Sequence, residues 1–465
     1  MSRAPRWFRD SDRSPRFRLD RATGRIAPPD RDGAPPVAGD ERDAGAPPAG
    51  AAERGVGAPA AGGLRLYVSG DIIWERDLMA YLLERPPHHA LGRVREIWAD
   101  GDVVFAQQET CYGESRDDEL PGKRISYLTD PRLLPHLAEG GFNLACLASN
   151  HTMDYGGDPV EYTRRALAGI GIACSGSGRN LAAAREPALV AARGWTVALL
   201  SYATDDEETN AGPDRPGNAP FRRELVVEDV RAARGKADFV LVSVHRGREF
   251  VYFPSPEHQA DCRAVVDAGA DVVLGHHPHF MQGMEWRRRP DGRQALIFYS
   301  LGSLLIDYEP ALTRYEQELF YRSQRNNFVA ALDLDEGGVA GLRLTPVRQT
   351  ADWSVRRETP DETGHTWDLV EWTSHPLNHP EPCTKFWVTG WAYLAMQYPA
   401  LILQLSRRPA SIRNALGWMA REETVRLHWG SLFARDMPAW LLGLRRRSLD
   451  AVRRAWRALR GRRTI

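Results

Sequence analysis

Short apolar runs recur between residues 64 and 335, and this repetition constrains the fold more than any other feature. The runs read LRLYVSGD, DVVFAQQE, FNLACLASNH, TVALLSYA, DFVLVSVH, DVVLGHHPH, LIFYSLGS and NNFVAALDLD. Several are apolar throughout rather than alternating, as expected for strands that are covered on both faces. Helical stretches such as DPVEYTRRALAGIG lie between them. The pattern therefore predicts a layered α/β domain over residues 64–350.

The two flanks of this region have a different composition. Residues 1–63 are rich in Arg, Asp, Pro, Ala and Gly, and they cannot bury enough apolar surface to offset the entropy cost of ordering. We expect a disordered N-terminal tail there. Residues 351–465 are expected to form a Trp-rich, mainly helical C-terminal extension, which opens on a loop-like stretch at 365–382.

Two segments of the C-terminal extension raise the question of a membrane. Residues 386–405 carry no charge, but Gln and Pro interrupt them, which favours a helix packed on the core or at an interface over a spanning helix. The basic tail 440–465 holds nine arginines and one acid between Arg445 and Arg463. Its apolar residues recur at helical steps, so it is either a solvated surface helix or an interfacial helix at the inner membrane face or on an acidic polymer.

Cysteine usage and the N-terminus bear on the compartment. The five cysteines are scattered and form no CxxC pair, which is typical of thiols in a reducing compartment. The N-terminus has no apolar h-region, so we expect no secretory signal and a cytoplasmic location. The formal net charge is zero, and we expect no nucleic-acid partner.

Polar side chains with metal-ligand chemistry follow the apolar runs, where open α/β sheets collect ligands. Two neighbouring cations would need a bridging carboxylate surrounded by N and O ligands. His277 and His279, at i and i+2, would face the same way from a strand and reach one centre. The SGSGRN stretch at 175–180 lacks the residues of a P-loop and predicts a tight turn. The strand-end residues, in chain order, are Asp71, Glu109, Asn150, His151, Asp154, His245, Glu249, His277 and His279.

Through these motifs the chain resembles the CapA, or poly-γ-glutamate capsule synthesis, family, a branch of the calcineurin-like metallophosphoesterase superfamily. The resemblance covers roughly residues 64–350. It rests on GDIIWERD, VVFAQQE, GFNLACLASNHTMDYG, GIACSGSGRNLAAAREPA, VSVHRGREF, PSPEHQADCRAVVDAGADVVLGHHPHFMQ and LIFYSLGSLLID. It implies a four-layer αββα metallophosphoesterase-like sandwich between the disordered tail and the helical extension.

The resemblance also implies a role for each matched residue. One or two divalent ions, Mn, Fe or Zn, are expected as cofactors, and Arg246 would favour an anionic substrate beside the site. His151 is expected to contact the reacting group, and His276 falls one position early in the GHxH match. The implied metal ligands are Asp71, Glu109, Asn150, His245, His277 and His279; the catalytic residues are His151 and Arg246; the surrounding polar residues are Arg76, Asp154, Glu249 and His276.

Three positions depart from the motifs of the superfamily. Ile73 stands where the first motif, Asp-x-His, has its histidine, so one metal site has fewer protein ligands. The usual NLE reads QQE at 107–109, and the usual HWG reads HRG at 245–247.

Several functions remain open on this resemblance. The first is a metal-dependent hydrolase of phosphoester or amide bonds, with His151 assisting the leaving group, that takes part in poly-γ-glutamate synthesis or processing. The second is a non-catalytic subunit that binds the anionic polymer, and the third is a metallophosphoesterase unrelated to a capsule. A poly-γ-glutamate ligase would be the expected protein partner in the first two cases.

Overall fold

The computed structural model describes residues 18–27, 62–123, 125–249, 251–307, 325–374 and 376–378. The uncharged stretch 386–405 and the basic tail 440–465 lie outside these residues. Contacts divide the chain into a unit of Met1–Met396 and a unit of Gln397–Ile465, and all described residues belong to the first. Among them, no helix combines the length and apolar character that a membrane span requires.

One sheet is built on parallel strands whose buried runs were predicted from the sequence. The strand β9 pairs antiparallel with β10, and β14 pairs antiparallel with β15. The parallel strands between them follow the order of the chain. The strands are β9 (Ala188–Ala192), β10 (Trp195–Ala203), β12 (Phe239–His245), β13 (Val272–His276), β15 (Gln294–Phe298) and β14 (Met284–Arg288).

A second group of strands surrounds β5. The strands β3, β5, β6 and β7 are parallel in that order, β4 pairs with β5 and β16, and β17 pairs antiparallel with β3 and β18. A pairing between β15 and β18 links this group to the first sheet. The strands are β3 (Leu64–Val68), β4 (Asp71–Ile72), β5 (Val103–Gln108), β6 (Leu144–Cys146), β7 (Ala173–Ser175), β16 (Ser303–Leu305), β17 (Asn326–Asp335), β18 (Gly338–Gln349) and β19 (Val355–Arg357).

Alternating side chains on these strands divide the core into layers. On β5, Phe105 belongs to a central cluster that also contains Leu241 of β12, whereas Val104 packs in a cluster with the helices of its own side. On β12, Val242 turns the other way, into a cluster with Val265 of the opposite helices. Two sheets therefore face each other across the central cluster, and each carries helices on its outer face, which confirms the predicted four-layer αββα arrangement.

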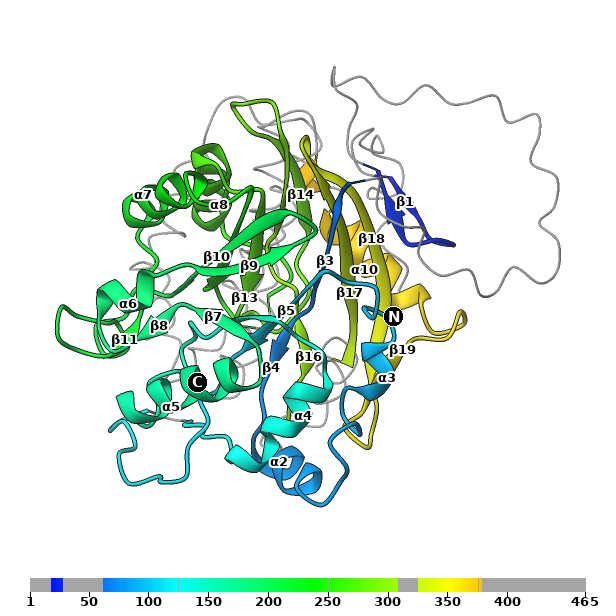
Figure 1. Cartoon of the computed structure of the whole chain (residues 1–465). Helices are drawn as coiled ribbons and strands as arrows, with labels where there is room; N and C mark the ends of the chain where they lie inside the picture. The colour runs from blue at the N-terminus through cyan, green and yellow to red at the C-terminus, as the bar shows by residue number, and fades with distance from the viewer. Residues whose placement is uncertain are drawn as a thin grey trace, which may run out of the picture. The chain divides into compact units, whose positions relative to one another are not determined.

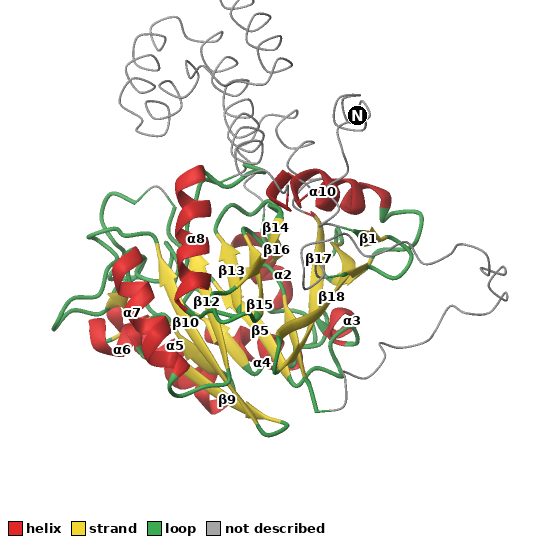
Figure 2. Cartoon of the chain, turned by 90° about the horizontal axis from the view of Figure 1, so that it is seen from above, coloured by secondary structure: helices red, strands yellow, loops and turns green. Residues whose placement is uncertain are grey.

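The helices between residues 76 and 268 lie on the two outer faces (Figure 1). The helices α2, α3, α4 and α5 supply apolar residues to the cluster of β3 to β6, and α7 and α8 supply those over β10, β12 and β13 (Figure 2). The remaining short pieces are a two-stranded pair and a 3-10 turn. These elements are α2 (Arg76–Leu82), α3 (Gly92–Arg95), α4 (Leu134–Glu139), α5 (Gly157–Gly169), α6 (Leu181–Arg185), α7 (Arg223–Arg234), α8 (Pro256–Ala268), β8 (Ser177–Gly178), β11 (Gly217–Asn218) and η2 (Pro131–Leu133).

The turn predicted at 175–180 joins β7 to α6 by way of β8. Gly176 adopts a left-handed backbone with φ of 103°, and the side chain of Asn180 accepts a hydrogen bond from the Ala183 amide at the start of α6. The stretch thus serves as a turn and a helix cap.

The expectation of a disordered tail is wrong for residues 18–27. They form a hairpin of β1 (Leu19–Asp20) and β2 (Arg25–Ile26), and β2 pairs with β18. Ile26 is buried in the central cluster, and Arg21 forms ion pairs with Asp368 and Glu371. The hairpin is therefore ordered by contacts with residues more than 300 positions away, which composition does not reveal.

The expectation of a loop at 365–382 is also wrong over most of the described part. Residues Gly364–Ser374 form α10, and Pro376–Asn378 form the 3-10 turn η3. Trp367, Leu369 and Val370 of α10 pack in the central cluster with β17 and β18 residues. The boundary predicted at residue 350 therefore cuts through a continuous core, which includes residues up to 378.

Candidate metal centre

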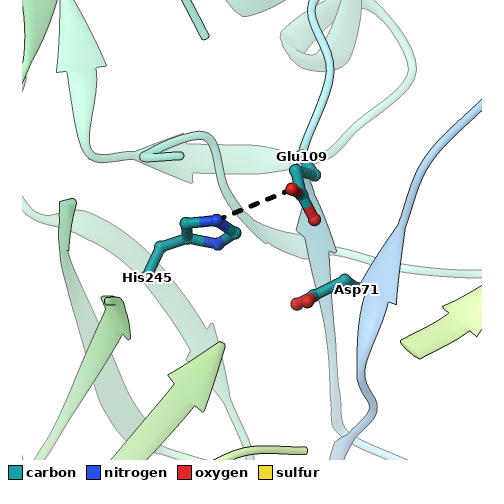
Figure 3. Close-up of side chains that lie close together, drawn as sticks. All are labelled: Asp71, Glu109 and His245. Atoms are coloured by element: carbon teal, nitrogen blue, oxygen red, sulfur yellow. Dashed lines mark ion pairs between the residues drawn. The ribbon is translucent and has the colours of Figure 1, made fainter. Parts of the chain in front are cut away.

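Three buried side chains with metal-ligand chemistry converge where β3, β5 and β12 end (Figure 3). Asp71 begins β4, Glu109 follows the last residue of β5, and His245 ends β12. Each offers one ligand atom, and these atoms lie within 4.8 Å of one another. The closest ion-pair distance, from His245 Nε2 to Glu109 Oε1, is 3.6 Å.

Gly70 allows Asp71 to reach this position. The backbone N–H of Asp71 donates to the carbonyl oxygen of Gly302, at 2.9 Å. A Cβ on residue 70 would lie 2.3 Å from that same carbonyl oxygen, which is inside any real contact distance. Only glycine therefore fits before Asp71 where β4 approaches the segment leading into β16.

Two imidazoles and a backbone amide surround the Asp71 carboxylate. His276 Nδ1 lies 2.6 Å from Oδ1, His279 Nδ1 lies 3.2 Å from Oδ2, and the His277 amide donates to Oδ2 at 3.3 Å. Burial raises the pKa of Asp71, but the charges and hydrogen bonds of His276 and His279 outweigh it and hold this pKa well below its usual range. Asp71 is thus an ionised carboxylate in the interior.

The histidines reach the centre by a different geometry from the one expected. The strand β13 ends at His276, and both His277 and His279 lie beyond it with left-handed backbones, φ of 91° and 57°. The expectation that both project from one strand face is therefore wrong. Left-handed backbone is unfavourable for residues other than glycine, and two such residues at a cluster of ligands are typical of functional sites.

Electrostatics separate the two histidines beyond the strand. Burial lowers the pKa of His279, but the carboxylates of Glu109 and Asp71 raise it by more than burial lowers it. The pKa of His279 is therefore raised to about 9. Burial lowers the pKa of His277 to about 4. The His277 ring lies 5.1 Å from the His245 ring and 6.2 Å from the His279 ring, between centroids.

Glu109 provides the test of whether a cation fits. Both of its carboxylate oxygens are buried without a hydrogen-bond partner, and burial raises its pKa well above the usual value. A carboxylate withdrawn from water without partners is costly, whereas a bound divalent cation satisfies it directly. Two carboxylates and an imidazole match the donor preference of first-row ions. The residues therefore fit a divalent metal.

Asn150 belongs to the same centre. Its amide Oδ1 lies 2.7 Å from Nε2 of His245, which links the 149–154 turn to β12. Burial lowers the pKa of His245 well below its usual value, so this imidazole is neutral and able to bind a metal. Asn150 and His245 thus lie side by side, as two residues that are expected to bind the same metal centre must.

His151 is held by a carboxylate of its own turn. Its Nδ1 lies 2.7 Å from Oδ2 of Asp154, and its ring centroid is 4.4 Å from the Tyr127 ring. Burial lowers the pKa of His151, so the imidazole is neutral near pH 7. Because the carboxylate can only accept, Nδ1 carries the proton and Nε2 is left as an acceptor.

The Arg246 side chain is engaged by neighbouring residues. Its guanidinium forms ion pairs with Asp261, at 2.6 Å, and with Glu257, at 3.4 Å, and it lies over the Phe221 ring. Two acids and an aromatic ring already occupy this cation, so the geometry does not support it as a group that contacts the substrate.

Two further expected residues lie at the edge of the site. Arg76 begins α2 with a left-handed backbone, φ of 55°, and its guanidinium lies over the Tyr127 ring. Glu249 is exposed, and its negative charge contributes to the raised pKa values of Glu109 and His279. These positions are consistent with the expectation that Arg76 and Glu249 lie around the metal ligands and do not bind the metal themselves.

Sequence reasoning missed three residues that contact the proposed ligands. Gln107 Nε2 lies 3.4 Å from Nδ1 of His245, and Ser303 Oγ lies 3.2 Å from Nδ1 of His279. Lys123 contacts the backbone oxygen of Asn150 and the carboxylate of Asp154. Two of them left a signal in the sequence: Gln107 departs from the usual NLE motif, and Lys123 is one of three lysines in a chain with 61 basic residues.

A family model for the bacterial capsule synthesis protein PGA_cap matches residues 65–308, more than half of the 465 residues. The chain belongs to this family. The match includes every residue of the centre described above, from Asp71 to His279. The resemblance read from the motifs is thereby confirmed.

Curated relatives from several bacteria are similar to the chain. A capsule biosynthesis protein CapA of Bacillus anthracis is 27% identical over 279 residues, which cover 58% of this chain and 66% of that protein. A PGA biosynthesis protein CapA of Bacillus subtilis is 25% identical, with 65% and 79% covered. A probable polyglutamine synthesis accessory protein of Mycobacterium tuberculosis is 30% identical, with 57% and 70% covered. The chain thus spans just under two thirds of the Bacillus anthracis relative.

Solved structures give weaker alignments. A hypothetical protein from Thermus thermophilus aligns with a TM-score of 0.37 and 17% identity, covering 64% of this chain and all of that one. A putative 5'-nucleotidase from Staphylococcus aureus aligns with a TM-score of 0.39 and 15% identity, covering 66% and 58%.

Proposed function

We propose that the chain is a metal-dependent, hydrolase-like component of poly-γ-glutamate capsule synthesis or processing. The observation that carries this proposal is the buried Glu109 carboxylate, whose two oxygens have no hydrogen-bond partner and which offers a ligand atom within 4.8 Å of those of Asp71 and His245. Membership of the capsule synthesis family supplies the polymer context. The names of the CapA and accessory-protein relatives support the same context.

The proposed metal site uses Asp71, Glu109, Asn150, His245, His277 and His279. A bound Mn, Fe or Zn ion would supply Lewis-acid polarisation of a phosphoryl or carbonyl oxygen. Burial of the two carboxylates in this pocket keeps water from screening their charge.

His151 is proposed to assist the leaving group by relaying a proton: its neutral Nε2 first accepts a proton from the attacking water, and the resulting imidazolium gives that proton to the leaving-group atom. Asp154 holds its Nδ1 proton, which fixes the ring and leaves Nε2 as the atom that exchanges a proton with the substrate. The neighbouring Asn150 ties the same turn to the metal centre through His245. Proton transfer and metal binding therefore come from adjacent residues of one turn.

A non-catalytic, polymer-binding role is the second candidate, and one residue favours it. Ile73 is buried and apolar at the position where the superfamily's first motif has a histidine ligand. A centre with one fewer protein ligand would bind a cation less tightly, and through that cation it could bind an anionic polymer without catalysing its hydrolysis.

The test combines metal analysis with activity assays on the purified full chain. We expect one or two divalent ions by elemental analysis, and turnover of a phosphoester or of a γ-glutamyl peptide. His151→Gln should keep the metal and lose turnover by about 10²–10⁴-fold. Bound metal without turnover on either substrate would favour the polymer-binding role, and absence of metal after reconstitution would exclude both forms of the proposal.

A further inference from the structure

Lys123 reaches from a separate loop onto the turn that carries Asn150 and His151. Its ammonium contacts the backbone oxygen of Asn150 and Oδ1 of Asp154, and it lies 3.4 Å from Nδ1 of His151. The Lys123 side chain is 21% exposed, whereas Asp154 is 1% exposed. An ammonium is thus positioned where the backbone and side chains of one short turn converge.

We propose that Lys123 is a positioning residue of the proposed site. Its ammonium holds the 149–154 turn, so that Asn150 and His151 point in fixed directions. This inference rests on the proposed function for its catalytic consequence, but its structural content does not depend on it. Since Nδ1 of His151 donates to Asp154, the approach of Lys123 to Nδ1 is a contact and not a hydrogen bond. Lys123 therefore acts on His151 through the Asp154 carboxylate.

The rest of the turn shows why such a clamp is needed. Ser149 and Thr152 fix its first half, because the His151 amide donates to Ser149 Oγ and the Ser149 amide donates to Thr152 Oγ1. The carbonyl of Asn150 is satisfied by Lys123. Without the ammonium, that carbonyl and one oxygen of a buried carboxylate lose their donor.

The loop that carries Lys123 contacts the turn at two further points. The Leu120 amide donates to the backbone oxygen of Asp154, at 2.8 Å, and the Tyr127 amide donates to its Oδ2, at 2.7 Å. Asp154 thus receives donors from both sides of Lys123. This arrangement places the lysine at the centre of the contact between loop and turn, rather than at its edge.

The residue type also fits the geometry. An ammonium is compact and directs three donors to acceptors that converge on one point, whereas a guanidinium spreads its donors in a plane. The chain uses arginine for nearly all its positive charge, with lysine at only three positions. We infer that arginine does not satisfy the contacts at position 123.

The experiment follows the tautomer of His151 in metal-free, full-length protein labelled with 15N-histidine. His151→Gln assigns the signal, and Lys236→Met, at an exposed lysine after α7, is the matched control. We expect a single Nδ1-protonated form in the wild type and in Lys236→Met. Lys123→Met and Lys123→Arg should show two exchanging forms, because Asp154 Oδ1 loses its donor and the carboxylate can turn away from the His151 ring.

A single Nδ1-protonated form in Lys123→Met would overturn the proposal, and Lys123→Arg decides in the same way if the Met variant does not fold. The NMR measurement needs neither metal nor turnover, so it distinguishes failure of this inference from failure of the proposed function. Where turnover is found, Lys123→Met should lower kcat about 10- to 100-fold with KM unchanged.

Discussion

His276 Nδ1 lies 2.6 Å from Oδ1 of Asp71, and both side chains are fully buried. This contact joins the end of β13 to the start of β4, across the face where the proposed ligands meet. Nε2 of His276 has no hydrogen-bond partner. His276 thus directs its donor at the carboxylate, and it orients a ligand rather than standing apart from the centre.

His276→Phe should therefore weaken metal binding without removing the centre. The aromatic ring keeps the volume, but the Asp71 carboxylate loses the donor that fixes its orientation. We expect the affinity for Mn or Zn to fall about 10- to 100-fold, measured by titration of the metal-free protein. His88→Asn, at an exposed position, is the control and should bind as the wild type does. If His276→Phe binds Mn or Zn as tightly as His88→Asn does, His276 has no role in orienting the Asp71 carboxylate.

Glu109→Gln should change the protein in opposite directions with and without metal. The substitution removes a buried carboxylate whose oxygens have no partner. The metal-free variant should therefore be more stable than the wild type at pH 8, by about 1–3 kcal/mol, since a buried charge without hydrogen bonds costs more than the neutral amide that replaces it. The metal-dependent rise in melting temperature should disappear, because the ligand charge is gone.

Thermal unfolding in chelator and in excess Mn distinguishes these effects. Glu119→Gln, at an exposed position, should resemble the wild type under both conditions. A Glu109→Gln protein that is still stabilised by the ion, or that is less stable than the wild type in chelator, would contradict the assignment of Glu109.

The part of the site that sequence predicted is the part set by strand ends. Asp71, Glu109 and His245 each stand at or beside the end of an apolar run, and the ends of neighbouring parallel strands meet. A layered α/β domain followed similarly from runs that are apolar throughout, whereas the four-layer arrangement was implied by the family resemblance. Local sequence therefore carried enough information for these elements.

The parts that sequence did not predict depend on contacts between distant segments. Arg246 follows His245 directly, yet its guanidinium pairs with Asp261 on α8. Lys123 lies in a polar loop, where no periodicity indicates its partners on the 149–154 turn. Such contacts are decided by tertiary packing, which composition and spacing do not encode.

Ile26 tests whether the N-terminal hairpin belongs to the folded core. Its side chain is buried in the central cluster, and β2 pairs with β18. Ile26→Ala should lower the free energy of unfolding by about 2–4 kcal/mol, as for other buried aliphatic residues. Ile170→Ala, at a 37% exposed position, should change it by no more than about 0.5 kcal/mol. Urea denaturation measures both, and equal small effects would return residues 18–27 to a tail that does not stabilise the domain.

Glu358 should make the stability of the domain depend on pH near neutrality. Its carboxyl is buried between β19 and α10, where the hydroxyl of Thr366 donates to it at 2.8 Å. Burial raises its pKa from the usual 4.5 to about 7. Between these pH values the folded protein binds a proton that the unfolded chain has released. The stabilisation by this proton is complete below pH 4.5 and is lost as the pH rises through 7.

Glu358→Gln should remove that dependence, because the amide keeps the hydrogen bond and does not ionise. We expect the stability of the variant relative to the wild type to increase by about 1–3 kcal/mol between pH 5 and pH 8, as a shift of this size implies. Urea denaturation at the two pH values measures the difference, and Glu336→Gln, at an exposed position, should show no change. The raised pKa is excluded if the difference between Glu358→Gln and wild type is the same at both pH values. That outcome would mean that water or Arg348, whose guanidinium lies 3.7 Å away, compensates the carboxylate fully.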